Sequence, residues 1–292
     1  PHTCVVIDME ERTYISSMGL RVMLSLRKSV DMELINLSQE VWNVFEMTGF
    51  NQMIKMRKAF RRISVEGCVL LGEGANGSVY RLDDETIVKL YRPGTNLTVI
   101  DQERSYAQTA FLAGMPTAIP FDVVREGNRY GIVFELIDAS TFDHMLTDDR
   151  MRFDAHVADY VSLLMSMHET DVEIGKLPDM KDKYHVWIDM LADKYTAEER
   201  RKMHRMVEAV PDSTKLLHGD FHPRNIMTQG GELLLIDMAD ISTGHPIFDL
   251  AGVGLTHKHY PTISPETCTH YIGLTSETLM DIWGKLLAQY FS

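Results

Sequence analysis

Short apolar runs alternate with helically spaced apolar residues over the first 57 positions of the chain. Three of these runs predict strands, at residues 5–8, 32–37 and 53–56. The first strand is expected to be buried. Between the runs, apolar positions three or four residues apart predict helices at residues 20–26 and 38–50. The β-α-β-α-β order therefore predicts a small α/β module at residues 1–57.

The pattern changes at a basic stretch, residues 58–66. A short charged run most often forms a solvated connector, so we interpret this stretch as a linker or a short helix. Residues 67–137 then contain mainly strand-forming runs, together with a helix at residues 101–112. Four residues are expected on the apolar face of that helix: Ala107, Ala110, Phe111 and Leu112.

Helical spacing dominates from about residue 150 onward. His168 shares an apolar helix face with Val161 and Leu164, which predicts a satisfied core histidine rather than a ligand. Three more core residues are expected in the helices at residues 181–209, namely Trp187, Ile188 and Leu191. After the basic stretch, these patterns predict an α+β arrangement with a strand-rich part at 67–137 and a mostly helical part at 138–292.

The charge balance bears on the class of ligand. The net charge is −13, which argues against nucleic acid as a partner because phosphate backbones attract the opposite sign. Residues 1–66 hold nine Lys and Arg against eight Asp and Glu, so the rest of the chain holds 20 against 34. An acidic surface attracts cations and could favour a cationic substrate, although most acidic surfaces merely keep a protein soluble.

Other compositional features concern the cellular setting. There is no run of 18 apolar residues and no signal peptide is visible, so no membrane span is expected. Cys4, Cys68 and Cys268 are odd in number and widely spaced, which fits neither a disulfide framework nor a zinc knuckle. Reduced cysteines predict a cytoplasmic protein.

A glycine-rich loop supplies the first candidate chemistry. Gly72, Gly74 and Gly77 would let backbone amides close over phosphate groups, as they would in a dinucleotide site or a kinase. The loop continues into a strand rather than a helix, and the next apolar strand contains Lys89. A buried strand normally excludes lysine, whereas a kinase needs it there to hold the α- and β-phosphates. The combination favours a kinase.

A kinase lysine needs a carboxylate from the following helix to hold it in place. Glu103 is the expected partner of Lys89, and Asp101 is the alternative.

The residues from His218 to Asn225 supply the second candidate chemistry. Asp220 is followed five residues later by Asn225, and Asp237 ends a short apolar strand. Phosphoryl transfer needs one carboxylate for the attacking hydroxyl and oxygen ligands for magnesium, so this trio suits it. The Gly230-Gly231 pair predicts a tight β-hairpin that returns Asp237 to the side of Asn225.

His218 and His222 lie four residues apart in the same stretch, a spacing that also occurs in zinc sites. No third ligand stands nearby, so we do not assign a metal to them.

Together, the motifs of residues 72–80, 89, 218–225 and 236–237 resemble those of the aminoglycoside phosphotransferase and choline kinase family. The resemblance spans roughly residues 66–292. It implies a bilobal protein-kinase-like fold, ATP as donor, Mg²⁺, and transfer of the γ-phosphoryl to a hydroxyl of a small molecule. The lobes would be residues 67–137 and 138–292.

Several roles follow from this resemblance. Asp220 would be the catalytic base, Asn225 and Asp237 the magnesium ligands, and Lys89 the phosphate clamp. The strand at residues 131–137 would lead into a hinge, followed by a helix at 140–146. The Glu135 carbonyl and the Ile137 amide would bind the adenine there. Asp249 would buttress the catalytic loop.

Two features separate the chain from protein kinases. Gly219 stands where protein kinases have an arginine that receives an activation-loop phosphate. Only eleven residues lie between Asp237 and Asp249, which leaves no room for a long activation segment. A small-molecule kinase is therefore favoured. A serine protein kinase acting on Ser17 or on a partner protein, and a non-catalytic nucleotide-binding regulator, remain the alternatives.

Residues 4–57 resemble the second half of a STAS domain, the anti-sigma-factor-antagonist fold. The resemblance lies in residues 5–8, 15–20 and 38–50, while the leading strands of the family are missing, as in a fragment of a longer polypeptide. It implies a phosphorylatable serine at Ser17, although Ser16 replaces the usual aspartate, and either serine can cap the helix. We expect a docking or regulatory module that forms a dimer contact, binds a partner protein or packs on the kinase through an unpaired sheet edge.

Overall fold

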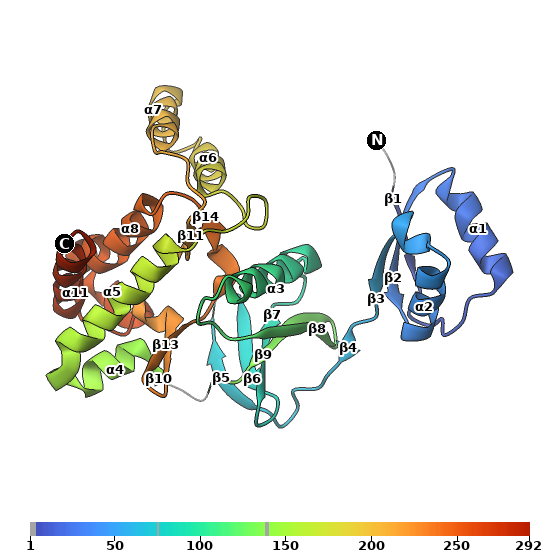
Figure 1. Cartoon of the computed structure of the whole chain (residues 1–292), viewed down its shortest axis with the longest axis horizontal. Helices are drawn as coiled ribbons and strands as arrows, with labels where there is room; N and C mark the ends of the chain where they lie inside the picture. Colours follow the sequence, from blue (N-terminus) through green and yellow to red (C-terminus); the bar gives the residue numbers. More distant parts are fainter. Residues whose placement is uncertain (1–3, 75, 138–139) are drawn as a thin grey trace. The chain divides into compact units, whose positions relative to one another are not determined.

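The computed structural model describes residues 4–74, 76–137 and 140–292, with the backbone alone at position 267. The chain divides into two compact units (Figure 1). Unit 1 contains residues 1–64 and 123–128, and unit 2 contains residues 65–122 and 129–292. No helix in the described ranges has the length and apolar character needed to cross a membrane.

Unit 1 is built on a three-stranded sheet in the order β1-β2-β3, in which both pairs of strands are parallel. The strands are β1 (Cys4–Asp8), β2 (Asp31–Leu37) and β3 (Lys55–Lys58). Helices α1 (Ser17–Arg27) and α2 (Gln39–Met47) connect them. Their N-caps are Ser16 and Ser38, whose hydroxyls accept backbone N–H groups of the first turn. The predicted β-α-β-α-β order is confirmed.

Three details of unit 1 differ from the sequence interpretation. Strand β1 is exposed rather than buried, with 56% of Val6 accessible, because β1 is an edge strand that pairs only with β2. Strand β3 begins at Lys55, after a 3-10 turn at Phe50–Gln52. The basic stretch contains the short strand β4 (Arg61–Arg62), which pairs in parallel with Val124 and Arg125, and not a helix.

The first part of unit 2 is a sheet in the order β8-β9-β7-β6-β5, flanked by helix α3 (Leu97–Leu112) (Figure 1). The end of β8, from Val123 on, belongs to unit 1. The strands are β5 (Val69–Glu73), β6 (Gly77–Arg81), β7 (Thr86–Tyr91), β8 (Pro120–Glu126) and β9 (Arg129–Glu135). Strands β5 and β6 form the predicted hairpin of the glycine-rich loop.

Helix α3 corrects the sequence interpretation in two ways. It begins four residues earlier than expected, because the Asn96 side chain caps it by accepting the Thr98 N–H. Its buried face carries Ile100, Glu103, Ala107 and Ala110, whereas Phe111 and Leu112 are exposed. Leu112 lies five positions after Ala107, which turns it away from the buried face.

The second part of unit 2 is mainly helical. Its main helices are α4 (Phe142–Asp148), α5 (Phe153–Glu169), α6 (Met180–Met190), α7 (Ala197–Glu208), α8 (Ile247–Gly254), α9 (Tyr260–Ile263), α10 (Pro265–Tyr271) and α11 (Ser276–Tyr290). Its short strands are β10 (Ser140–Thr141), β11 (Leu216–Leu217), β12 (Ile226–Gln229), β13 (Glu232–Leu235) and β14 (Ser242–Thr243). Strands β12 and β13 form the predicted Gly230-Gly231 hairpin, and both glycines have positive φ.

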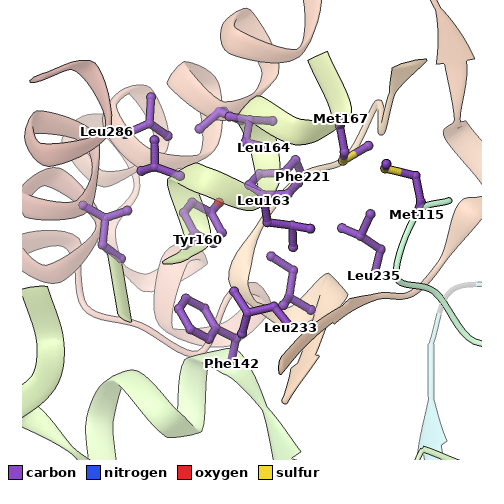
Figure 2. Close-up of a cluster of buried hydrophobic side chains, with 14 of the residues drawn as sticks. Met115, Phe142, Tyr160, Leu163, Leu164, Met167, Phe221, Leu233, Leu235 and Leu286 are labelled. Atoms are coloured by element: carbon purple, nitrogen blue, oxygen red, sulfur yellow. The ribbon is translucent and has the colours of Figure 1, made fainter. Parts of the chain in front are cut away.

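A buried cluster of aromatic and aliphatic side chains holds this helical part together (Figure 2). Tyr160 of α5 is at its centre, with its ring 5.6 Å from Phe142 and 4.6 Å from Phe221. Phe221 directly follows Asp220, so the Phe221 side chain anchors the predicted catalytic loop in the core.

Three expectations for the helical part need correction or confirmation. The helix expected at 140–146 begins at Phe142, because residues 140 and 141 pair with β12 instead. Trp187 and Leu191 are exposed and only Ile188 is buried, where it packs in a small cluster with Val207, Leu217 and Phe248. His168 is a satisfied core histidine, as predicted.

Candidate active site

A cavity of about 570 Å³ lies in unit 2 between the strand-rich part and residues 225–238 of the helical part. Seven residues that the sequence assigned to nucleotide or metal binding line it: Gly72, Lys89, Glu103, Glu135, Ile137, Asn225 and Asp237. Apolar side chains such as Val79, Phe134 and Ile236 form much of the remaining wall. Gly74, Gly77 and Asp220 do not line this cavity.

Lys89 is held between two carboxylates. Its Nζ lies 2.7 Å from Glu103 Oε1 and 2.8 Å from Asp237 Oδ1. Burial alone would lower the pKa of Lys89, but the two carboxylates outweigh it and raise the pKa above the usual value. Lys89 is therefore a fixed positive charge. Asp101, the alternative partner, lies 3.3 Å from Arg104 on the surface.

The glycine-rich loop closes with a hydrogen bond from Gly74 N to Gly77 O at 2.9 Å. A Cβ added at Gly77 would lie 2.0 Å from the Leu90 carbonyl oxygen, so no side chain fits between β6 and β7 there. A Cβ at Gly74 would meet nothing within 4 Å. Gly77 therefore allows β6 and β7 to lie close together, whereas Gly74 leaves open space at the tip of the loop.

The connector after β9 has a defined hydrogen-bond polarity. The Leu136 N–H donates to the Glu85 carbonyl, and the Glu135 N–H donates to the Ile119 carbonyl. Thr86 and Glu135 consequently form a non-hydrogen-bonded pair, in which the Glu135 carbonyl faces away from β7. Within the described residues no hydrogen bond occupies the Ile137 N–H. Glu135 and Ile137 both line the cavity.

Asp220 lies in a tight loop that its own neighbours fasten. The Asn225 side-chain amide donates to the Asp220 backbone carbonyl at 2.9 Å and to its Oδ2 at 3.1 Å. His222 Nε2 lies 3.5 Å from the same Oδ2. Burial would raise the pKa of Asp220, but His222, His218 and Asn225 together lower it below the usual value. Asp220 is therefore ionised at neutral pH and able to accept a proton.

The base of this loop rests on Asp249, as expected. The fully buried Asp249 carboxylate accepts the His218 N–H and the Gly219 N–H, each at 2.8 Å, and lies 3.2 Å from His168 Nε2. His168 is fixed in turn by the Tyr290 hydroxyl, 2.7 Å from its Nδ1. Burial would raise the pKa of Asp249, but these partners lower it.

Gly219 has no room for a side chain. Its φ is +80°, and an added Cβ would lie 2.5 Å from the Asp240 carbonyl oxygen. The absence of an arginine at this position, which the sequence showed, is thus a packing requirement of the loop.

The β12–β13 hairpin brings the two predicted metal ligands together. Ile236 N donates to the Asn225 carbonyl at 2.9 Å, which places Asp237 directly beside Asn225. Asp237 has the left-handed backbone conformation, φ 59° and ψ 67°, which is uncommon for a residue other than glycine. Such strain persists where the surrounding structure requires a particular side-chain direction.

His218 is buried, and its Nε2 lies 3.2 Å from the Ile236 carbonyl oxygen. No group of three or more His, Cys, Asp or Glu in the part of the chain that the structure describes is placed to hold a metal ion.

The sequence did not indicate one further contact that fastens the loop. Arg224 Nε donates to the buried Asp143 carboxylate of α4 at 3.2 Å, and Arg224 Nη1 donates to the His270 carbonyl at 2.8 Å. Asp143 precedes Arg224 by 81 residues and belongs to no local motif. No sequence pattern would have paired them.

Two family models match the chain. The model described as "Phosphotransferase enzyme family" matches residues 67–273, and the STAS domain model matches residues 1–63. A comparison of the sequence with curated proteins gives no significant match.

Solved structures of low sequence identity are similar to this chain. The amicoumacin kinase hAmiN, in complex with AMP-PNP, Ca²⁺ and Ami, is 16% identical with a TM-score of 0.51 over 84% of this chain and 77% of its own. An aminoglycoside-3'-phosphotransferase of type VIII is 19% identical with a TM-score of 0.48, over 77% of this chain and 94% of its own.

A choline/ethanolamine kinase family protein from Mesorhizobium loti is 15% identical with a TM-score of 0.46, over 76% of this chain and 78% of its own. Unit 2 therefore has the bilobal protein-kinase-like fold, and unit 1 is a STAS-like module. Because the family model covers more than two thirds of its residues, the chain belongs to the phosphotransferase enzyme family.

Proposed function

We propose that the chain is an ATP-dependent phosphotransferase that transfers the γ-phosphoryl group of MgATP to a hydroxyl group of a small molecule. The observation that carries the proposal is the placement of an ionised Asp220 next to Asn225, and of Asn225 and Asp237 on a cavity that contains the paired Lys89. A base, metal ligands and a phosphate clamp are the parts that phosphoryl transfer requires.

The connector polarity supports adenine as the base. Adenine presents an amino donor at N6 and an acceptor at N1, which match the Glu135 carbonyl and the Ile137 amide. Guanine presents an acceptor and a donor in the opposite order, so it would place like groups against each other. A buried mismatch of this kind costs about 1–3 kcal/mol for each unpaired group. ATP is therefore the proposed donor.

The residues present also fit magnesium. The Asn225 amide nitrogen is used by Asp220, so its carbonyl oxygen is turned the other way and is available as a ligand. Asp237 offers a second carboxylate oxygen beside the one that Lys89 binds. An amide oxygen and a carboxylate oxygen are ligands that Mg²⁺ prefers. Mg²⁺ held there would neutralise negative charge on the phosphates.

Proton transfer is the task of Asp220. Its carboxylate accepts the proton of the acceptor hydroxyl as that oxygen bonds to the γ-phosphorus and the bond to the β–γ bridging oxygen breaks. ADP leaves with the electron pair of the broken bond. Lys89 holds phosphate oxygens, and Glu103 keeps Lys89 extended toward them.

A small molecule is the favoured acceptor. After Asp237 the chain forms one 3-10 turn, Met238–Asp240, and then the strand β14, which pairs with β11. This leaves no extended segment to receive a protein substrate. The acidity of residues 67–292 supports a cationic acceptor.

The test is a screen of purified protein with labelled ATP against aminoglycosides, macrolides, choline-like amines and sugars. The matched control is Asp220→Asn, which should lose phosphoryl transfer by about 10²–10⁴ in rate while still binding MgATP. Near-normal turnover of this variant would refute the assignment of Asp220. Transfer to a protein serine, with none to any small molecule, would refute the acceptor class.

A further inference from the structure

We propose that His222 is a positioning residue that fixes the Asp220 carboxylate and leaves its Oδ1 for the acceptor hydroxyl. This inference rests on the proposed phosphotransferase function and goes beyond it by giving His222 a task. His222 contacts Asp220, lines no part of the cavity described above, and has no role in nucleotide binding.

The two oxygens of Asp220 are treated unequally. Oδ2 receives the Asn225 amide at 3.1 Å and faces His222 Nε2 at 3.5 Å. Within the described residues Oδ1 forms no hydrogen bond, and the side chain is half exposed. One donor would let the carboxylate turn about its last torsion, since that torsion is broad. The His222 ring, 3.5 Å from the same oxygen, is a second contact that restricts this rotation.

His222 is itself held firmly. Only 15% of its side chain is exposed, and its backbone carbonyl accepts the Asn225 N–H at 2.9 Å. Its Nδ1 is buried and has no hydrogen-bond partner among the described residues. A proton on Nδ1 would thus be a buried donor without an acceptor, which costs about 1–3 kcal/mol. The proton consequently sits on Nε2, where it points at Asp220.

No other group performs the same task. His218 also faces Asp220, but its Nδ1 accepts the Asp220 backbone N–H at 3.3 Å and does not touch the carboxylate. Asp249 binds the backbone of the two preceding residues. His222 is therefore the one histidine, among the residues described, whose ring lies within 4 Å of the Asp220 carboxylate oxygens.

Two amide substitutions test the proposal as a matched pair. In His222→Gln the amide nitrogen can reach the position of Nε2, whereas in His222→Asn it can reach only the position of Nδ1. We expect His222→Asn to lower kcat about 10- to 100-fold, because small misplacements of a reacting group cost about this much. The Kd for MgATP and the KM for the acceptor should stay within about two-fold. His222→Gln should recover most of kcat, and the exposed His259→Asn should change nothing.

The outcomes separate the interpretations. Equal losses in the Gln and Asn variants, or full activity in both, would overturn the proposal. A loss confined to KM or to the Kd for MgATP would show that His222 contacts a substrate instead. If wild-type protein transfers phosphate to no acceptor, the proposed function fails. In that case crystal structures of the two variants still test the role of His222. The Asp220 carboxylate should rotate in His222→Asn and keep its orientation in His222→Gln.

Discussion

Replacing Asp249 by Asn tests how the catalytic loop is supported. The substitution keeps the size of the side chain, but one of its two oxygens becomes an NH₂ group. Oδ1 accepts the Gly219 N–H, while Oδ2 accepts the His218 N–H and faces His168. Whichever way the new amide turns, its NH₂ group must therefore oppose at least one buried backbone N–H.

The magnitude follows from these contacts. A hydrogen bond to a charged group contributes about 1.5–3 kcal/mol, and a buried donor left unpaired costs about 1–3 kcal/mol more. We therefore expect Asp249→Asn to lower the free energy of unfolding by about 3–5 kcal/mol. Whole proteins have about 5–15 kcal/mol of stability, so the variant should fold but with a displaced Asp220 and reduced kcat.

Urea denaturation followed by circular dichroism measures the change, and Asp159→Asn on the exposed side of α5 is the control for the loss of one charge. A decrease below about 1 kcal/mol in Asp249→Asn would refute the reasoning, because one lost charge-assisted bond already exceeds it.

Three further predictions concern the metal, the pH and the first unit. Asp237→Ala should weaken magnesium-dependent nucleotide binding in calorimetry and leave the metal-independent part unchanged; equal loss in both would contradict its role as a ligand. Because the pKa of Asp249 is lowered by folding, its stabilisation is fully present above the unfolded value of about 3.9 and is lost as the pH falls through the lower folded value. The free energy of unfolding should therefore fall less steeply with decreasing pH in Asp249→Asn than in wild type. Removing residues 1–64 should leave ATP turnover largely intact and change solubility or oligomeric state, as gel filtration can show; an inactive but folded remainder would place unit 1 in the active site.

The sequence predicts those parts of the site that depend on short-range geometry. Asp220 and Asn225 share one loop, and a two-glycine hairpin returns Asp237 to them. Lys89 and Glu103 lie farther apart, but a lysine in an apolar strand needs a carboxylate, and Glu103 is on the buried face of the next helix. In such cases local conformation and a charge requirement leave few alternatives.

Long-range packing is what the sequence does not predict. The exposure of Trp187 and of strand β1 depends on which elements cover them. The spacing of apolar residues in a helix or strand does not show which element will cover them. The pairs Asp143–Arg224 and His168–Asp249 each join residues 81 positions apart. The local sequence around each residue gives no sign of its partner, and the two residues meet only in the folded chain.

The ion pair between Lys89 and Asp237 has a consequence for the order in which the site is filled. A free divalent cation that approaches Asp237 meets a carboxylate already neutralised in part, with an ammonium group 2.8 Å from one oxygen. A polyphosphate chain competes for that ammonium group and releases the carboxylate. If the chain has the proposed function, we therefore expect cation and nucleotide to bind with positive cooperativity, each raising the affinity of the other by the same factor. We then expect the cation to enter as a complex with the nucleotide, and the empty site to have little affinity for the cation alone.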